Sequence, residues 1–168
     1  MKLSKVFQSF ALTLIVAVGA SAQTRGIGVG GYLQAGNSGE DGGLNAKLFL
    51  NQMDAIDLSL SIQMSPFGES MGAYVSYLFH YWNVIPMTTG KLPLYWGPNG
   101  GVGTWPGGSV IRFGAVGGMD YCLPQGTAPL DFYLQLNPNI EAVSPKGGKM
   151  SMGLNLYLQL GMRFFFGG

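Results

Sequence analysis

Apolar and polar residues alternate through the last part of the chain, from Met150 to Phe166. Every even-numbered position is Met, Leu or Phe, and most odd-numbered positions are polar residues or glycine. A period of two places side chains on opposite faces of an extended strand, whereas a helix would scatter the apolar set around its circumference. About 10 tilted residues suffice to cross an outer membrane. The pattern therefore predicts a membrane-spanning strand with one lipid-facing side.

Seven earlier segments show the same alternation. They are residues 25–36, 44–50, 56–64, 72–82, 92–103, 111–121 and 130–143. The connections at 37–43, 51–54, 65–71, 83–91, 105–108, 124–129 and 144–149 are polar or rich in Gly and Pro, as turns are. Pro98 implies a bulge or an unpaired stretch within the fifth segment. Together the segments predict an all-β fold, an eight-stranded antiparallel up-and-down transmembrane β-barrel.

The two faces of the segments indicate which side meets lipid. The apolar face is nearly uniform Leu, Ile, Val and Met, and the polar face carries mostly neutral groups, which suits a packed interior better than a wet surface. Aromatic residues collect at strand ends, as in the interfacial girdles of membrane barrels. These residues are Tyr81, Trp82, Trp96, Trp105, Phe164 and Phe166. The alternative with the opposite orientation is a soluble, lipocalin-like barrel that binds a small apolar ligand.

The first residues have the organisation of a secretory signal. Lys2 and Lys5 precede an apolar stretch at 6–19, and Ala20-Ser21-Ala22 supplies small residues for cleavage. An uncleaved membrane helix is the alternative, but the apolar stretch is short for spanning. We expect residues 1–22 to be a cleaved signal peptide and residues 23–168 to form one barrel domain.

Composition excludes several classes of protein. Without Lys2 and Lys5 the chain has seven Lys and Arg against eight Asp and Glu, a net charge of −1, so nothing predicts nucleic-acid binding. Only 10% of residues are charged, and no second run is long enough for a membrane helix. The single cysteine, Cys122, cannot form an internal disulfide and is expected to be a small apolar filler.

Charged residues on the polar face are expected inside the barrel. They are Lys47, Asp57, Arg112, Asp120, Asp131, Glu141 and Arg163. Charges in low dielectric must pair to offset desolvation, so we predict a structural salt-bridge network, with an ion or proton path as the alternative. Asp131 is expected to pair with Arg112 or Arg163 on a neighbouring strand. An eight-stranded barrel is just wide enough for side chains to fill it, so we predict no diffusion pore.

The sequence offers little for catalysis or cofactors. His80, the only histidine, could form a Ser-His-Asp site with Ser76, but no oxyanion hole or nucleophile elbow accompanies it. A metal site lacks ligands. Gly26, Gly28 and Gly30 superficially match a dinucleotide fingerprint, but no helix follows them, and small residues in a crowded interior account for them better. We expect no catalytic, cofactor or metal site, with a membrane-embedded hydrolase or acyltransferase as the enzymatic alternative.

Three segments carry a resemblance to a known family. They are Leu92-Pro93-Leu94-Tyr95-Trp96-Gly97, the segment 128–136 with Pro138, and Gly161-Met162-Arg163-Phe164-Phe165-Phe166. In these the chain resembles BAPKO-like outer-membrane β-barrels, a family of unknown function that is similar in architecture to the OmpX and OmpA transmembrane domains. The resemblance implies a small barrel without catalytic residues. Gly167 and Gly168 depart from the pattern, because such barrels often finish on the aromatic residue itself.

These features together predict a structural or surface-interaction role in a Gram-negative-type envelope. An even number of strands places both termini on one side, which we expect to be periplasmic. The expected partners are the lipid bilayer, the outer-membrane assembly machinery and an unidentified extracellular protein that could add a strand to an exposed edge. We expect a monomer.

Overall fold

The computed structural model describes residues 26–37, 39–65, 68–124 and 127–166, so the predicted signal peptide and Gly167 to Gly168 lie outside the described residues. Eight strands follow one another along the chain. They are β1 (Ile27–Gly36), β2 (Gly39–Phe49), β3 (Asp54–Ser65), β4 (Gly68–Tyr81), β5 (Leu94–Trp105), β6 (Gly108–Cys122), β7 (Leu130–Pro145) and β8 (Ser151–Phe166). None of the described residues forms a helix with the length and apolar character of a membrane span.

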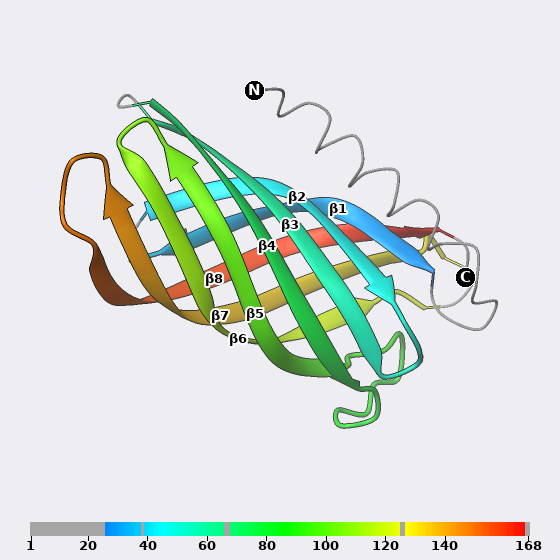
Figure 1. Cartoon of the computed structure of the whole chain (residues 1–168). Coiled ribbons are helices and arrows are strands. Elements are labelled where there is room, and N and C mark those ends of the chain that lie inside the picture. The colour runs from blue at the N-terminus through cyan, green and yellow to red at the C-terminus, as the bar shows by residue number, and fades with distance from the viewer. Residues whose placement is uncertain (1–25, 38, 66–67, 125–126, 167–168) are drawn as a thin grey trace.

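Each strand pairs antiparallel with the next, and β8 pairs antiparallel with β1 (Figure 1). The sheet is therefore a closed barrel, and the predicted eight-stranded up-and-down fold is confirmed. Ile27 pairs with Phe166 at one end of the barrel, which we call the termini end. The tight turns of the β1–β2, β5–β6 and β7–β8 hairpins lie at the other end, which we call the far end.

The turns at the far end are shorter than predicted. Residues 39–43 belong to β2 and residues 68–71 to β4, and only positions 106–107 separate β5 from β6. β7 continues to Pro145, so the first two residues of the predicted turn at 144–149 belong to the strand. Glycine and serine hide the alternation of a strand because they add no apolar side chain to either face, and this led to the overestimate of loop length.

The predicted division into two faces is confirmed. On β7, Phe132 and Leu136 project outward and are nearly half exposed, whereas Asp131 and Asn137 are buried inside the barrel. The same alternation holds on β4, where Val75, Tyr77 and Tyr81 are exposed and Ser76, Leu78 and His80 are buried. Because a two-residue period fixes one face to the outside, the outward-facing side chains along the middle of the barrel are mostly apolar, and most of the lumen is lined by polar groups.

Two prolines interrupt the hydrogen-bonded ladder without shifting it. Pairing of β4 with β5 lapses opposite Pro98, between Phe79–Trp96 and Ser76–Asn99, and resumes in the same register. Pairing of β6 with β7 lapses in the same way beside Pro138. Proline has no backbone N–H to donate. Of the two alternatives for Pro98, the unpaired stretch is therefore confirmed and the bulge is not found.

The register around the barrel gives a large stagger. One row runs from Val29 through Ala46, Leu58, Val75, Gly100, Phe113 and Ile140 to Leu154. Leu154 lies three residues before Tyr157, the partner of Gly36, so it is level with position 39 of the first strand. The shear is therefore 39 − 29 = 10 residues. With eight strands such a stagger goes with a strong tilt and a lumen about as wide as its side chains.

Glycines on the inner face of β1 allow close packing. A Cβ at Gly30 would overlap the carbonyl oxygen of Met162 on β8, and a Cβ at Gly28 would lie 2.6 Å from the ring of Phe165. A larger residue at Gly30 would displace the β8 backbone, and one at Gly28 would displace the Phe165 ring. The interpretation of these glycines as small residues in a crowded interior is confirmed.

Candidate functional site

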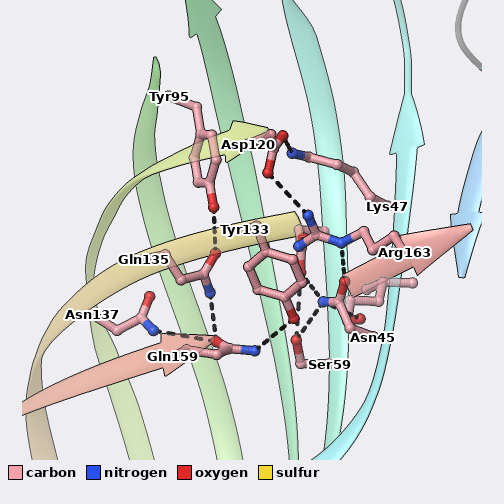
Figure 2. Close-up of polar contacts among 12 residues, drawn as sticks. Asn45, Lys47, Ser59, Tyr95, Asp120, Tyr133, Gln135, Asn137, Gln159 and Arg163 are labelled. Carbon is pink, nitrogen blue, oxygen red and sulfur yellow. Dashed lines mark hydrogen bonds and ion pairs between the residues drawn. The ribbon is translucent and has the colours of Figure 1, made fainter. Parts of the chain in front are cut away.

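The most densely bonded part of the lumen is a cluster of charges near the termini end, which we call the ion cluster. It consists of Asn45 and Lys47 on β2, Asp57 on β3, Asp120 on β6 and Arg163 on β8 (Figure 2). Arg163 Nη2 donates to Asp57 Oδ2 over 2.5 Å, and Arg163 Nη1 to Asp120 Oδ1 over 3.3 Å. Arg163 Nε donates to Asn45, and Lys47 Nζ donates to Asp120. The charged groups are at most 3% exposed.

The ion cluster is balanced in charge and enclosed by aromatic rings. Two cations face two carboxylates, and the Arg163 guanidinium lies 3.6 Å from the centre of the Tyr133 ring. Lys47 Nζ lies 4.4 Å from the centre of the Tyr95 ring. Buried charges need this combination of opposite charge, hydrogen bonds and polarisable surface to offset their desolvation. The arrangement can hold strands together, and it leaves no cation of the cluster without a carboxylate.

An aromatic cluster lies beside the ion cluster at the termini end. Phe49, Phe165 and His80 pack there, and the Phe49 ring centroid lies 4.9 Å from that of His80 and 6.0 Å from that of Phe165. His80 Nδ1 lies 3.2 Å from the carbonyl oxygen of Met53, and His80 Nε2 lies 3.7 Å from Asp120 Oδ2. These contacts fit the expected role of His80 as an aromatic hydrogen-bonding group.

Trp82, one of the expected interfacial residues, is partly buried and packs against this group. Its ring centroid lies 5.9 Å from those of Phe49 and His80, and its indole N–H donates to the carbonyl oxygen of Gln52. Trp82 directly follows Tyr81, the outward-facing last residue of β4, and therefore continues the inward side of that strand, in phase with Leu78 and His80.

Four of the predicted interfacial aromatics project from the outer surface at the termini end. Tyr81, Trp96, Phe164 and Phe166 are 40–58% exposed. The Trp96 indole donates to the Tyr81 hydroxyl over 3.2 Å, and the rings of Phe164 and Phe166 lie 4.9 Å apart. The sixth, Trp105, ends β5 at the far end, where it lines a cavity.

Amide side chains form a second layer across the middle of the lumen (Figure 2). Tyr95 donates to Gln135 Oε1 over 2.9 Å, and Gln135 Nε2 donates to Gln159 Oε1 over 2.5 Å. Asn137 also donates to Gln159, and Gln159 Nε2 donates to the Tyr133 hydroxyl over 3.2 Å. The sequence places these residues on the polar face, but their connection depends on the register that sets Gln135 level with Gln159.

A second ion pair, Arg112 with Glu141, lies toward the far end on the paired positions of β6 and β7. Glu141 also accepts hydrogen bonds from Asn155 and from the Tyr157 hydroxyl, the latter over 2.5 Å. The Arg112 guanidinium lies 5.3 Å from the ring centres of Tyr74 and Tyr157. Its side chain is 14% exposed, so this pair is less enclosed than the ion cluster.

The lumen opens at the far end into a cavity of about 350 Å³, which we call the vestibule. Glu40, Asp41, Trp105, Arg112 and Glu141 contribute to its wall. A much smaller polar cavity of about 20 Å³ lies among the amide residues, and Tyr74 and Tyr157 line both cavities. The polar interior therefore changes along the barrel from a packed cluster to an open cavity.

The seven charged residues predicted for the interior all lie there, in two groups. Lys47, Asp57, Asp120 and Arg163 belong to the ion cluster, Arg112 and Glu141 form the second pair, and the remaining one is Asp131. Asp131 is buried and level with Arg163, yet the ion pairs of Arg163 go to Asp57 and Asp120. The predicted pairing of Asp131 with Arg112 or Arg163 is wrong within the described residues, because the long arginine reaches across the lumen.

Residues that could bind a metal do not gather in the part of the chain that the structure describes. No three side chains of His, Cys, Asp or Glu come together there. Ser76 lines the small polar cavity, and Cys122 is buried at the end of β6.

Comparison with known proteins gives a likeness in fold. No family model and no curated protein sequence matches the chain, so the predicted resemblance to BAPKO-like barrels is not supported. A solved structure described as that of Neisserial surface protein A (NspA) is 14% identical, with a TM-score of 0.48, over 83% of this chain and 96% of that chain. At this identity and score the likeness adds nothing to the architecture that the strand pairing itself establishes.

Proposed function

We propose that this protein is a small outer-membrane β-barrel with a closed lumen and a structural or surface-interaction role. The apolar outer surface supports membrane insertion. Leu33, Leu154 and Leu160 are 59–75% exposed, and in water such a continuous apolar surface would be costly. In lipid the same surface is favoured, and the polar groups are covered by the barrel wall.

The main support for a closed lumen is the ion cluster. Its residues come from β2, β3, β6 and β8, so their side chains converge from several sides of the barrel. The Tyr95–Gln135–Gln159 layer lies above it. Side chains bonded in this way leave no continuous aqueous path for a solute, and an eight-stranded barrel has no spare width.

A surface-interaction role is supported by the β7–β8 hairpin, which protrudes at the far end (Figure 1). Its residues from Ser151 to Leu156 pair with β7 but have no partner on β1 among the described residues. Met150, Met152 and Leu154 are at least 65% exposed there. An unpaired strand edge can accept a further strand. We place this end outside the cell and the termini in the periplasm, where the outer-membrane assembly machinery would insert the chain.

Reconstitution tests the closed lumen. In planar bilayers the protein should give at most sporadic conductance, and liposomes containing it should not swell in small sugars. Steady single-channel conductance from the unaltered protein would contradict the proposal. Migration in gels that changes on heating would first establish that the detergent-extracted protein is a folded barrel.

A matched pair of variants makes the measurement specific. Tyr95→Ala with Tyr133→Ala removes two rings that enclose the ion cluster, and the conductance should rise. Trp96→Ala with Phe132→Ala removes two aromatic rings from the next positions along the same strands, which face outward. This control should stay closed.

The alternatives from other classes find less support. A carrier of apolar ligands needs an apolar cavity. Met71, Val110 and Val143 contribute to the vestibule wall, but Asp41, Arg112 and Glu141 add charged groups to it, and the small cavity beneath is lined mostly by amides and hydroxyls. We therefore propose a non-enzymatic protein without a cofactor.

A further inference from the structure

The vestibule has an excess of negative charge. Glu40, Asp41 and Glu141 line it together with a single described cation, Arg112. Arg112 is already bound to Glu141, and Glu141 also receives donors from Asn155 and Tyr157. Within the described residues neither Glu40 nor Asp41 makes an ion pair. A cation that enters the cavity would reduce its net negative charge.

Hydrogen-bond acceptors without donors lie on the walls of both cavities. Asp41 Oδ1, Asn99 Oδ1 and Asn139 Oδ1 are inaccessible to solvent and have no hydrogen-bond partner among the described residues. Asn139 is only 4% exposed and, like Asn99, lines the 20 Å³ cavity below the vestibule. A buried acceptor without a donor keeps the full cost of its desolvation. What these cavities lack is therefore a source of N–H or O–H groups.

We propose that the vestibule binds a small aliphatic amine, such as a linear diamine or polyamine. A primary ammonium carries a positive charge and three hydrogen-bond donors. It would therefore balance the excess negative charge and also supply donors to the unpaired acceptors. The 20 Å³ cavity is about the size of one water molecule, which is also the size of an ammonium head, and the 350 Å³ vestibule accommodates the carbon chain. An anion would meet the carboxylates of Asp41 and Glu141, and no group of three metal-ligating side chains occurs among the described residues.

Two neighbouring tyrosines give the site its shape. Tyr74 and Tyr157 line both cavities, so they lie between the vestibule and the small cavity. Their rings also lie beside the Arg112 guanidinium, 5.3 Å from each ring centre. Arg112 thus covers aromatic surface and keeps its charge close to Glu141, so the carboxylates of Glu40 and Asp41 remain for a ligand.

Titration calorimetry of the whole protein in a non-ionic detergent tests the site. 1,4-Diaminobutane should bind saturably and more weakly as salt is raised, whereas 1,4-butanediol, its neutral isostere, should not bind. Absence of saturable binding by the diamine would overturn the proposal, as would equal binding of the diol. Saturable binding of succinate in place of the diamine would also overturn it, since that would make Arg112 the binding group.

Variants locate the binding. Asp41→Asn should weaken binding of 1,4-diaminobutane about tenfold, since a hydrogen bond to a charged group contributes about 1.5–3 kcal/mol. Asp54→Asn removes a carboxylate at the termini end, where Asp54 accepts from Asn51, and should leave the affinity unchanged. Gel migration that changes on heating confirms that each variant is folded.

If Asp41→Asn does not fold, Glu40→Gln at an exposed position replaces it and should weaken binding severalfold. An unchanged affinity in the folded variant would place the amine elsewhere and overturn the proposal. The inference goes beyond the closed lumen and does not depend on it. Binding is measured without ion flow, so a conducting barrel that binds the amine, or a closed one that does not, separates the two proposals.

Discussion

Two ion-paired regions of the same lumen differ in what surrounds them. In the ion cluster Arg163 has three acceptors on three strands, and all its partners are buried. In the vestibule Arg112 has one carboxylate partner on the adjacent strand, and its side chain is partly exposed. Both contain arginine and acidic residues, yet one is packed and balanced and the other is open and acidic.

The difference shows that polar composition alone does not define the role of a barrel interior. Cross-lumen bonds fill the ion cluster and leave it neither space nor charge for a ligand. Arg112 and Glu141 lie on two neighbouring strands and bond to each other along the barrel wall. The cavity above them therefore stays open. Whether a long side chain reaches across the lumen or along the wall decides between a packed region and an open cavity.

The largest effect should come from Arg163→Met. The substitution leaves Asp57 and Asp120 buried with only Lys47 to balance them, and removing one partner of a buried ion pair costs about 3–5 kcal/mol. Reversible urea unfolding of the protein in lipid vesicles measures the loss. Adding Asp57→Asn to Arg163→Met restores the charge balance and should recover part of the stability. If the double variant is no more stable than the single one, the ion cluster does not act as a unit.

The second-largest loss of stability should come from a charge on the outer face of the barrel. This prediction tests whether the ion cluster and the vestibule both lie in the lumen. Leu158 is 48% exposed on the apolar face near the middle of β8. Leu158→Arg should cost about 2–4 kcal/mol at mid-membrane depth. The adjacent Gln159→Ala, in the lumen, should cost about 1 kcal/mol for a lost hydrogen bond. A harmless Leu158→Arg in the same unfolding measurement would show that the faces are reversed.

The smallest of the three effects should come from Arg112→Met. Glu141 keeps its bonds to Asn155 and Tyr157, and water in the vestibule can reach the site, so the cost should be about 1–3 kcal/mol. The same unfolding measurement compares it directly with Arg163→Met. A cost equal to that of Arg163→Met would remove the distinction between the two regions.

Sequence periodicity was sufficient for the fold and for the face on which each charged residue lies. Periodicity could not predict which lumen side chains bond to one another. Those partners depend on the stagger of 10 residues around the barrel, which the sequence of a single strand does not reveal. Asp131 and Arg163 are level on neighbouring strands, so a pair between them was the natural hypothesis. The guanidinium instead extends to Asn45 and Asp57, a choice made by three-dimensional packing.

Residue type at a strand end was a misleading guide. Trp82 directly follows the outward-facing Tyr81, so alternation places it toward the lumen, whereas its aromatic character at a strand end favoured an interfacial position. The vestibule was missed for a related reason. Glu40 and Asp41 lie in a Gly-rich stretch that resembles a loop, although β2 carries both of them to the cavity wall.

The position of Arg163 on the final strand has a consequence for biogenesis. Asp57, Asp120 and Lys47 are all synthesised before β8, and without Arg163 they carry one net negative charge inside an unclosed sheet. The strand that closes the barrel by pairing with β1 also supplies the missing cation. A chain that lacks its final strand would therefore keep an uncompensated carboxylate in addition to an open sheet edge.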